Sequence, residues 1–378
     1  MKKKVGERRV LGHTVELKKK THRPPTRSKL PVLRPLCHLI PPHLVAQLAR
    51  DLGADKLART FSHWSHVVAL LYAQLTHAIS LNDVCDRLRL HSGPLSALRG
   101  ATPPSKNGLS HANKERDPAL AEALFWQMLA HWRGLCPALH GRAGRRWAGR
   151  FTRPIHIVDS TTIELIASCL DWAKHRRRKA AAQCPLRLDR QSFLPRFLLL
   201  DSARHADGHH ARAVCAGLRA GEIVLLDRAY VDFAPLLDLT QRGVFWGTRA
   251  KENHQLRVVK KLLKKPAGKI LRDDLVLLAV PATRALHPLR LRRVVAWVEV
   301  DGKEVEMTFL TNHLEWAAAS VVALYQCRWQ IEVFFKQIQQ TLPLADFLGH
   351  SARAVRWQVW PGASGRYHHY AASHSSSQ

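Results

Sequence analysis

The sequence predicts a mixed α/β fold with a helical N-terminal domain and a β-rich insertion. Three patterns in the 378 residues support this class. Apolar residues recur at helical spacing between residues 31 and 134, short β-like runs end at Asp159 and Asp227, and two alternating runs flank Asp301-Gly302. A chain of this length can bury a substantial core and exceeds the usual size of one domain, so we expect more than one structural unit.

The N-terminal third changes character at residue 31. Residues 1–30 are dense in Lys and Arg, contain Pro24-Pro25 and lack an apolar period. We expect a disordered basic arm, which either contacts phosphates without sequence preference or only keeps the chain in solution. Residues 31–134 then form a helical domain, in which Ser80 begins one helix and another starts after Pro118.

The remaining segments differ in composition and period. In chain order we expect a basic Gly- and Arg-rich linker (135–153), the first part of an α/β core (154–250), the β-rich insertion (251–312), the C-terminal helices of the core (313–360) and a polar tail (361–378). Val158 and Leu226 directly precede the two aspartates, and β-branched Thr161, Thr162 and Ile163 extend the first strand from Ile155 to Leu165. Asp301-Gly302 is a strong hairpin signal. The tail contains Pro361-Gly362 where a helix should continue, which suggests a truncated or frame-shifted copy or else a natural polar end.

The charge balance indicates the partner. Lys and Arg number 59 against 29 Asp and Glu, a formal net charge of +30. Such an excess predicts binding to a polyanion, because each neutralised phosphate releases condensed counterions. A purely structural basic protein has the same charge, but 46% hydrophobic residues favour a folded body. Charge alone leaves DNA and RNA equally open.

The cysteines and the lengths of the apolar runs indicate the cellular compartment of the protein. The seven cysteines are scattered and show no C-x-x-C pair, so we expect buried thiols in a reducing cytoplasm rather than disulfides or zinc. No run reaches the ~20 apolar residues that span a bilayer. We therefore expect a soluble cytoplasmic protein without contact to a membrane.

The stretch from Tyr325 to Gln339 contains strong helix formers and neither Gly nor Pro. On a continuous helix, Tyr325, Arg328, Glu332 and Lys336 lie on one narrow stripe. A carboxylate among cations on a helix is usually a surface ion pair. However, Asp159 and Asp227 each end a strand, and three such carboxylates can together hold hard divalent cations.

These segments resemble the three catalytic segments of DDE transposases of the IS4 insertion-sequence family. The match lies in Val158-Asp159-Ser160-Thr161-Thr162, in Leu226-Asp227-Arg228-Ala229-Tyr230 and in the spacing of Tyr325, Arg328 and Glu332. Gln339 occupies the place of the family's Lys. The resemblance covers about residues 31–360 and implies an RNase H-like catalytic core.

The resemblance also implies the chemistry. Asp159, Asp227 and Glu332 would be catalytic and would bind two Mg²⁺ ions, or Mn²⁺ in their place, for DNA cleavage and strand transfer. The implied partners are the terminal inverted repeats and the target DNA, bound by a homodimer associated with the bacterial nucleoid. In the resembling family the helical domain, here residues 31–134, helps to bind the repeats; the alternative is that it only braces the core. No Gly-rich phosphate loop is present, so we expect no small-molecule cofactor.

Several residues are candidates for contact with DNA. Tyr325 and Arg328 would grip terminal phosphates, and Lys336 would partly replace the missing Lys at position 339. The resemblance adds Arg228 and Tyr230 beside the second aspartate. The block from Lys174 to Lys179 is too dense in charge to be packed, so we expect a solvated loop in which Arg176, Arg177, Arg178 and Lys179 meet DNA. The candidates for stacking on a flipped base are Trp246, Trp297, Phe309 and Trp316.

Three other interpretations stay open. Gln339 and the altered end suggest a decayed copy that binds DNA without cutting it. A related nuclease would keep the three acids but would not join strands. A structural RNA-binding protein explains the charge but has no need of three carboxylates. The pairs His209-His210 and His368-His369 lack a third metal ligand at suitable spacing, so we expect them to be exposed to solvent.

Overall fold

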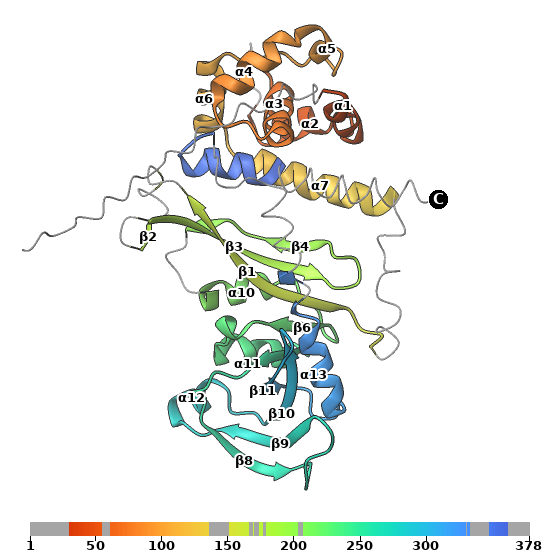
Figure 1. Ribbon diagram of the computed structural model, residues 1–378, viewed down its shortest axis with the longest axis vertical. Helices are drawn as coiled ribbons and strands as arrows, with labels where there is room; N and C mark the ends of the chain where they lie inside the picture. The colour runs from red at the N-terminus through yellow and green to blue at the C-terminus, as the bar shows by residue number, and fades with distance from the viewer. Residues whose placement is uncertain are drawn as a thin grey trace, which may run out of the picture.

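The computed structural model describes residues 30–54, 61–135, 151–165, 169, 174–176, 179–202, 207–329, 331–332 and 348–361. Helices gather at one end of the molecule, a twisted sheet crosses the middle, and the strands of residues 256–311 lie at the other end (Figure 1). Residues 1–29, residues 136–150 of the expected linker and the tail beyond 361 lie outside the described ranges. Within these ranges, no helix combines the length and the apolar character that crossing a membrane requires.

The helical end follows the spacing of apolar residues expected from the sequence. Its helices are α1 (Leu30–Leu39), α2 (Leu44–Asp51), α3 (His63–Thr76), α4 (Leu81–Leu90), α5 (Ser92–Ser96), α6 (Lys106–Glu115) and α7 (Ala119–Leu135). The Ser80 hydroxyl accepts a hydrogen bond from the Asp83 N–H at 3.1 Å, which confirms the predicted N-cap. Ser62 and Ser105 cap α3 and α6 in the same way.

A helix from the far end of the chain, residues 352–361, packs into this bundle beside α7 (Figure 1). Trp357 is fully buried and its indole N–H donates to the Arg116 carbonyl at 3.0 Å. Its ring centroid lies 4.3 Å from that of His66, and the Trp360 ring lies 5.2 Å from that of Phe125. The core of the bundle is therefore completed by residues more than 200 positions downstream.

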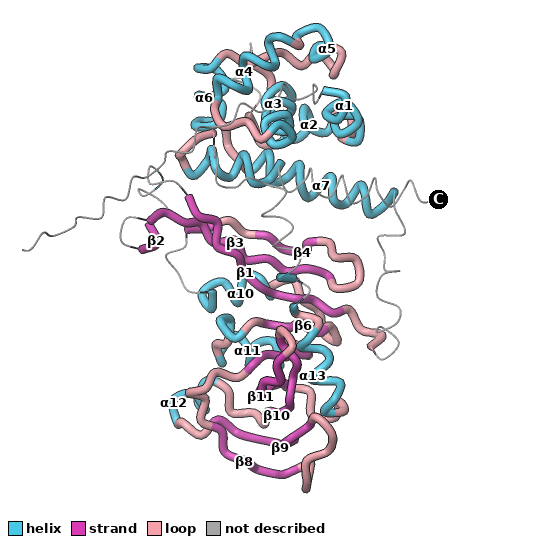
Figure 2. The backbone as a smooth tube through the Cα atoms, viewed as in Figure 1, coloured by secondary structure: helices cyan, strands magenta, loops and turns pink. Residues whose placement is uncertain are grey.

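Among the described residues, eleven strands form one mixed sheet (Figure 2). They are β1 (Ile155–Leu165), β2 (Lys174–Arg176), β3 (Lys179–Asp189), β4 (Pro195–Leu198), β5 (Asp201–Ser202), β6 (Ile223–Leu226), β7 (Phe245–Arg249), β8 (Leu256–Lys261), β9 (Ile270–Leu278), β10 (Leu291–Val300) and β11 (Lys303–Thr311). The order along the sheet is β2-β3-β1-β6-β7-β11-β10-β9-β8, with β4 and β5 paired to β3. The neighbours β1, β6 and β7 run parallel, and all other pairs run antiparallel.

The parallel centre of the sheet is buried on both faces, as its continuous apolar runs require. Val224 and Leu226 of β6 pack with α10 (Ala211–Cys215) and α11 (Phe233–Gln241). Ile223 and Leu225 point to the opposite face, where their cluster also contains Leu324 of α13 (Ala318–Gln326) and Trp357. This alternation fixes which residues at the strand ends face each other.

The expected hairpin is present, and it continues the central sheet. In β10 and β11, Val300 pairs with Lys303 across a turn in which Asp301 and Gly302 have φ of 50° and 75°. Both positive values match the turn that Asp-Gly favours. Because β11 pairs with β7, the strands of residues 256–311 extend the same sheet, with the short helix α12 (Pro281–Leu286) between β9 and β10.

The structure corrects one local expectation. Lys174–Arg176 and Lys179 belong to the paired strands β2 and β3, whereas a solvated loop was expected. β2 lies at the edge of the sheet, a position in which natural proteins often place charged residues.

Candidate active site

Two aspartates lie together at one edge of the parallel strands. The register pairs Val158 of β1 with Leu226 of β6, so Asp159 and Asp227 follow the same rung of the ladder. Asp159 Oδ1 accepts a hydrogen bond from the Ser160 N–H at 2.8 Å. Asp227 Oδ2 accepts one from the Ala229 N–H at 3.1 Å and so begins the turn η5 (Arg228–Tyr230). These backbone bonds fix the orientation of both carboxylates.

A third carboxylate reaches this edge from the segment after α13. The helix ends at Gln326, a turn covers Cys327 and Arg328, and residues 329, 331 and 332 are helical again. The N–H groups of Cys327 and Arg328 bond to carbonyls three residues earlier, at 3.1 and 2.9 Å. The expectation of one uninterrupted helix from Tyr325 is therefore wrong at this turn. Glu332 nevertheless remains one turn beyond Arg328 and on the same side.

Arg328 lies between the three carboxylates. Its Nη1 is 2.8 Å from Asp159 Oδ2, and its Nη2 is 2.8 Å from Glu332 Oε1 and 3.7 Å from Asp227 Oδ1. The Arg328 side chain is only 7% exposed, whereas that of Glu332 is 58% exposed. Residues separated by up to 173 positions thus converge on one guanidinium. We expected these three acids to converge, but the sequence did not show that an arginine would join them.

Burial and charge shape the electrostatics of this cluster. Burial raises the pKa of Asp159 to about 6, although the Arg328 charge and the Ser160 N–H act in the opposite direction. Burial also disfavours the charge on Arg328, but Tyr325 and the three carboxylates outweigh it and raise the Arg328 pKa. Because a single guanidinium lies near three carboxyl groups, additional positive charge at this site would be electrostatically favourable.

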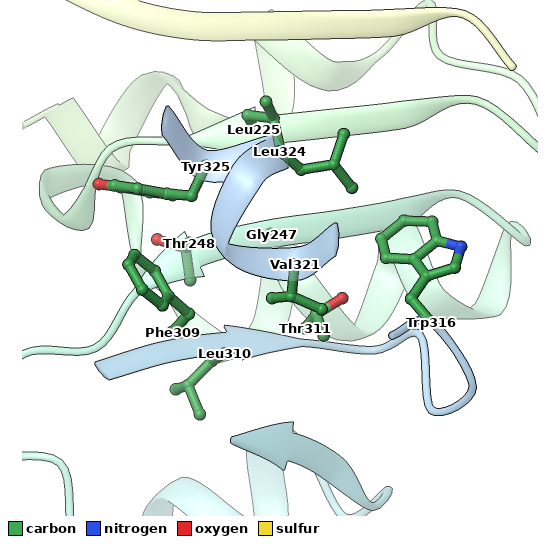
Figure 3. A pocket seen from close by; sticks show the side chains of 10 residues that line it. All are labelled: Leu225, Gly247, Thr248, Phe309, Leu310, Thr311, Trp316, Val321, Leu324 and Tyr325. Carbon is green, nitrogen blue, oxygen red and sulfur yellow. The ribbon is translucent and has the colours of Figure 1, made fainter. Parts of the chain in front are cut away.

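Tyr325 packs between the Arg328 guanidinium and Phe309. Its side chain is buried, its ring centroid lies 5.1 Å from that of Phe309, and the Arg328 Cζ lies 5.5 Å above it. Burial raises the pKa of Tyr325. Figure 3 shows a small apolar pocket beneath α13, with Tyr325 and Phe309 on one side and Trp316 on the other. The pocket lining holds α13 against β7 and β11.

The other candidates lie in different places. Arg228 is exposed beside Asp227, whereas Tyr230 is fully buried between α10 and β7. Arg176 and Lys179 lie where β2 meets β3, and Lys179 is about 23 Å along the strand from the residue opposite Asp159. Arg177, Arg178, Lys336 and Gln339 lie outside the described residues.

The aromatic and histidine candidates separate by exposure. Trp246 and Phe309 are buried, Trp316 is half-buried, and Trp297 is 38% exposed. His209 is exposed as expected, but His210 is buried, with its Nε2 3.9 Å from Asp201 Oδ2. The expectation that both histidines face solvent is therefore wrong, because α10 draws the second one against the sheet.

Arg249 is a cation that sequence reasoning missed. It ends β7, and because Leu226 pairs with Thr248, Arg249 lies beside Asp227 on the next strand. It is half-buried, and its charge acts to lower the pKa of Tyr325. The available signal was a basic residue directly after a third parallel strand.

The donor set is suited to hard divalent cations. All three side chains offer carboxylate oxygens, which Mg²⁺ and Mn²⁺ prefer. In the part of the chain that the structure describes, however, no three His, Cys, Asp or Glu side chains lie together in an arrangement that could hold a metal ion. The guanidinium occupies the centre towards which the carboxylates point.

Comparison with known proteins places this site in a family. The model of the transposase DDE domain matches residues 150–360, more than half of the chain. The chain belongs to the transposase DDE domain family. The three acids lie inside the part of the chain that matches this DDE domain, and the family implies divalent metal ions in general. A second model, a domain of unknown function called DUF4372, matches residues 28–98 at the helical end.

Relatives of this DDE transposase-family chain carry related names. A protein of Sinorhizobium fredii named as a transposase, y4zB, is 30% identical over 68% of this chain and 68% of its own length. A probable transposase for insertion sequence element IS5377 of Geobacillus stearothermophilus is 25% identical over 56% of this chain and 54% of its own length. The transposase for IS231D of Bacillus thuringiensis is 24% identical over 64% of this chain and 48% of its own length. The chain thus spans about half the length of the latter two.

A solved structure also aligns with the chain. It is a piggyBac transposase synaptic complex with hairpin DNA, which matches 90% of this chain and 74% of its own, with a TM-score of 0.39 and 9% identity.

Proposed function

We propose that this chain is a metal-dependent transposase of the IS4 type with an RNase H-like core. It binds the terminal inverted repeats of an insertion sequence and catalyses DNA cleavage and strand transfer. One observation carries the proposal: Asp159 within β1, Asp227 directly after β6 and Glu332 from a distant helical segment all contact Arg328. An ordinary surface ion pair would join Arg328 to only one carboxylate.

In this proposal, Asp159, Asp227 and Glu332 hold two Mg²⁺ ions, with Mn²⁺ as a substitute. Bound divalent ions supply an activated nucleophile and stabilise the leaving oxygen of a phosphodiester. Asp159 and Asp227 are oriented for this task by the Ser160 and Ala229 N–H groups. Glu332, with 58% of its side chain exposed, is the carboxylate with most freedom to adjust.

The proposed DNA path follows the cations around this edge. Arg228 and Arg249 flank Asp227, and further along lie Arg176 at the end of β2 and Lys179 at the start of β3. Arg177, Arg178, Lys336 and Arg328 complete the proposed phosphate-contacting set. Tyr325 and Tyr230 are buried, so in the proposal they contribute by packing beneath Arg328 and beside Asp227. Residues 31–134 bind the repeat, and two copies assemble across two DNA ends.

A cleavage assay tests the proposal. A labelled DNA fragment with the element's terminal repeat is incubated with Mg²⁺ or with EDTA, and a target plasmid is added to detect joining. The enzymes compared are the wild type, Glu332→Gln and a matched control, Glu122→Gln, which changes an exposed Glu on α7. We expect cleavage and joining by the wild type and the control, and neither by Glu332→Gln.

The other outcomes separate the alternatives. Metal- and Glu332-dependent cleavage without joining would identify a nuclease. Binding of the repeat without any cleavage, unchanged by Glu332→Gln, would identify an inactive DNA-binding descendant. Cleavage that persists in EDTA would contradict the proposed metal site.

A further inference from the structure

Arg328 has all its strong contacts inside the protein. Its two terminal nitrogens are directed at Asp159 and Glu332, each at 2.8 Å, and its side chain is 93% buried. Among the described residues, its Nε has no hydrogen-bond partner although it is buried. A guanidinium grips a phosphate through the same N–H groups. Arg328 therefore cannot keep these carboxylates and grip a DNA phosphate with the same nitrogens.

The carboxylates face the same conflict. Asp159, Asp227 and Glu332 are the proposed ligands of divalent cations, and a guanidinium 2.8 Å from two of them would lie next to any cation held there. Two positive charges this close repel each other strongly in a partly buried site. Contact with Arg328 and coordination of metal therefore compete for the same oxygen atoms.

The local backbone allows the side chain to change partners. Arg328 lies in the turn after α13, not in the middle of a helix. On one side α13 is fixed by Leu324 and Tyr325, which are buried, and on the other side Ile331 is fully buried. The guanidinium can therefore swing away while both flanking segments stay in place.

We propose that Arg328 is a positioning residue that acts as an exchangeable counter-ion. In the protein without metal it holds the three carboxylates together, and it moves to a DNA phosphate when divalent cations take those carboxylates. This inference rests on the proposed function and adds a consequence to it. Metal binding to the carboxylates frees Arg328 for a DNA phosphate, and phosphate binding to Arg328 frees the carboxylates for metal. Metal and DNA therefore increase each other's affinity by the same factor.

Metal affinity measured apart from catalysis tests this exchange. Free Mn²⁺ is followed by electron paramagnetic resonance during titration of the full chain, alone or saturated with a short duplex of the terminal repeat. Mn²⁺ bound elsewhere is subtracted with the double variant Asp159→Asn/Asp227→Asn on the same duplex. In the wild type, we expect the duplex to raise Mn²⁺ affinity about tenfold, within the usual range of coupled binding.

Two variants isolate the role of Arg328. Without DNA, Arg328→Gln should bind Mn²⁺ about tenfold more tightly than the wild type, and the duplex should add no further increase. Arg328→Lys keeps the positive charge but loses the planar guanidinium that can contact two carboxylates at once. Its Mn²⁺ affinity without DNA should therefore lie between those of the wild type and Arg328→Gln. Arg257→Gln removes an exposed charge on β8, the edge strand of the sheet, which lies outside the proposed DNA path, so it should retain the increase caused by DNA.

The outcomes distinguish this inference from the proposed function. If folded Arg328→Gln and Arg328→Lys bind Mn²⁺ no more tightly than the wild type, the exchange is wrong while the metal site stands. The same holds if Arg328→Gln keeps the full increase caused by DNA. If no protein shows Mn²⁺ binding that depends on Asp159 and Asp227, even with DNA, the proposed function itself fails, and the exchange fails with it.

Discussion

Asp273 and Arg292 form a buried, two-bonded ion pair across β9 and β10. Arg292 Nε lies 2.7 Å from Asp273 Oδ1, and Nη2 lies 2.6 Å from Oδ2. The remaining nitrogen, Nη1, donates to the carbonyls of Leu314 and Trp316, directly before α13. This pair therefore ties the outer strands to the segment that leads to Tyr325 and Arg328.

Breaking this pair should destabilise the protein. Arg292→Met leaves the Asp273 carboxylate buried and unpaired, so we expect the free energy of unfolding to fall by about 3–5 kcal/mol. Denaturant titration measures the loss. Arg257→Met, at an exposed position on β8, should change it by less than about 0.5 kcal/mol. A loss below 1 kcal/mol in Arg292→Met would show that the ion pair contributes little.

Trp357 should be equally important for the helical bundle. Trp357→Ala removes a fully buried ring and the hydrogen bond to the Arg116 carbonyl, so we expect a loss of about 3–5 kcal/mol on unfolding. Trp297→Ala, which removes a half-exposed indole from β10, serves as the matched control and should cost clearly less. Equal losses in the two variants would contradict the placement of residues 352–361 in the core.

His66 should make stability depend on pH. Burial lowers its pKa from 6.5 to about 3, although the bond to Asn113 acts in the opposite direction. Between these two pKa values, His66 binds a proton in the unfolded chain but not in the folded protein. The contribution of the neutral His66 to the free energy of unfolding is therefore fully present above pH 6.5 and decreases as the pH falls towards 3. Between pH 7.5 and 5, the wild type should lose about 2 kcal/mol more than His66→Gln.

The control for His66 is another histidine of the same bundle. His111→Gln changes an exposed position on α6, so it should keep the pH dependence of the wild type. Parallel curves for the wild type and His66→Gln would show that the buried imidazole does not cause the effect.

Asp159 should destabilise the protein when metal is absent. Its folded pKa of about 6 exceeds the usual 3.8, because burial disfavours the carboxylate. The protonated Asp159 carboxyl is therefore compatible with the folded state below pH 3.8, and the free energy of unfolding decreases as the pH rises through 6 and the carboxyl ionises. With EDTA at pH 8, Asp159→Asn should be more stable than the wild type by about 3 kcal/mol, and most of this difference should disappear by pH 4. A lower melting temperature for Asp159→Asn at pH 8 would mean that the Arg328 contact outweighs burial.

Local patterns predicted much of the fold. The strand from Ile155 to Leu165, the hairpin at Asp301-Gly302 and the helix capped by Ser80 lie where the sequence placed them. Each depends on neighbours within a few residues: β-branched side chains, a turn that needs positive φ, or a hydroxyl at a helix start. Such features remain visible in a single sequence.

Features that depend on distant partners were not predictable in this way. The helical pattern from Tyr325 onwards does not reveal the turn at Arg328, because two of the three carboxylates around that side chain, Asp159 and Asp227, come from distant strands. The order of the sheet, which joins β11 to β7, depends on register across 60 residues. The buried position of His210 and the role of Arg249 likewise appear only after the strands are assembled.

The packing of residues 352–361 against α7 has a consequence for biosynthesis. Helices near the start of the chain leave the ribosome first, but the groove around His66 and Phe125 is filled by Trp357 and Trp360. Until those residues emerge, the bundle exposes an apolar surface on which chaperones or other nascent chains can act. Residues 352–361 therefore complete the helical bundle, which reaches its final form only after Trp360 has been translated.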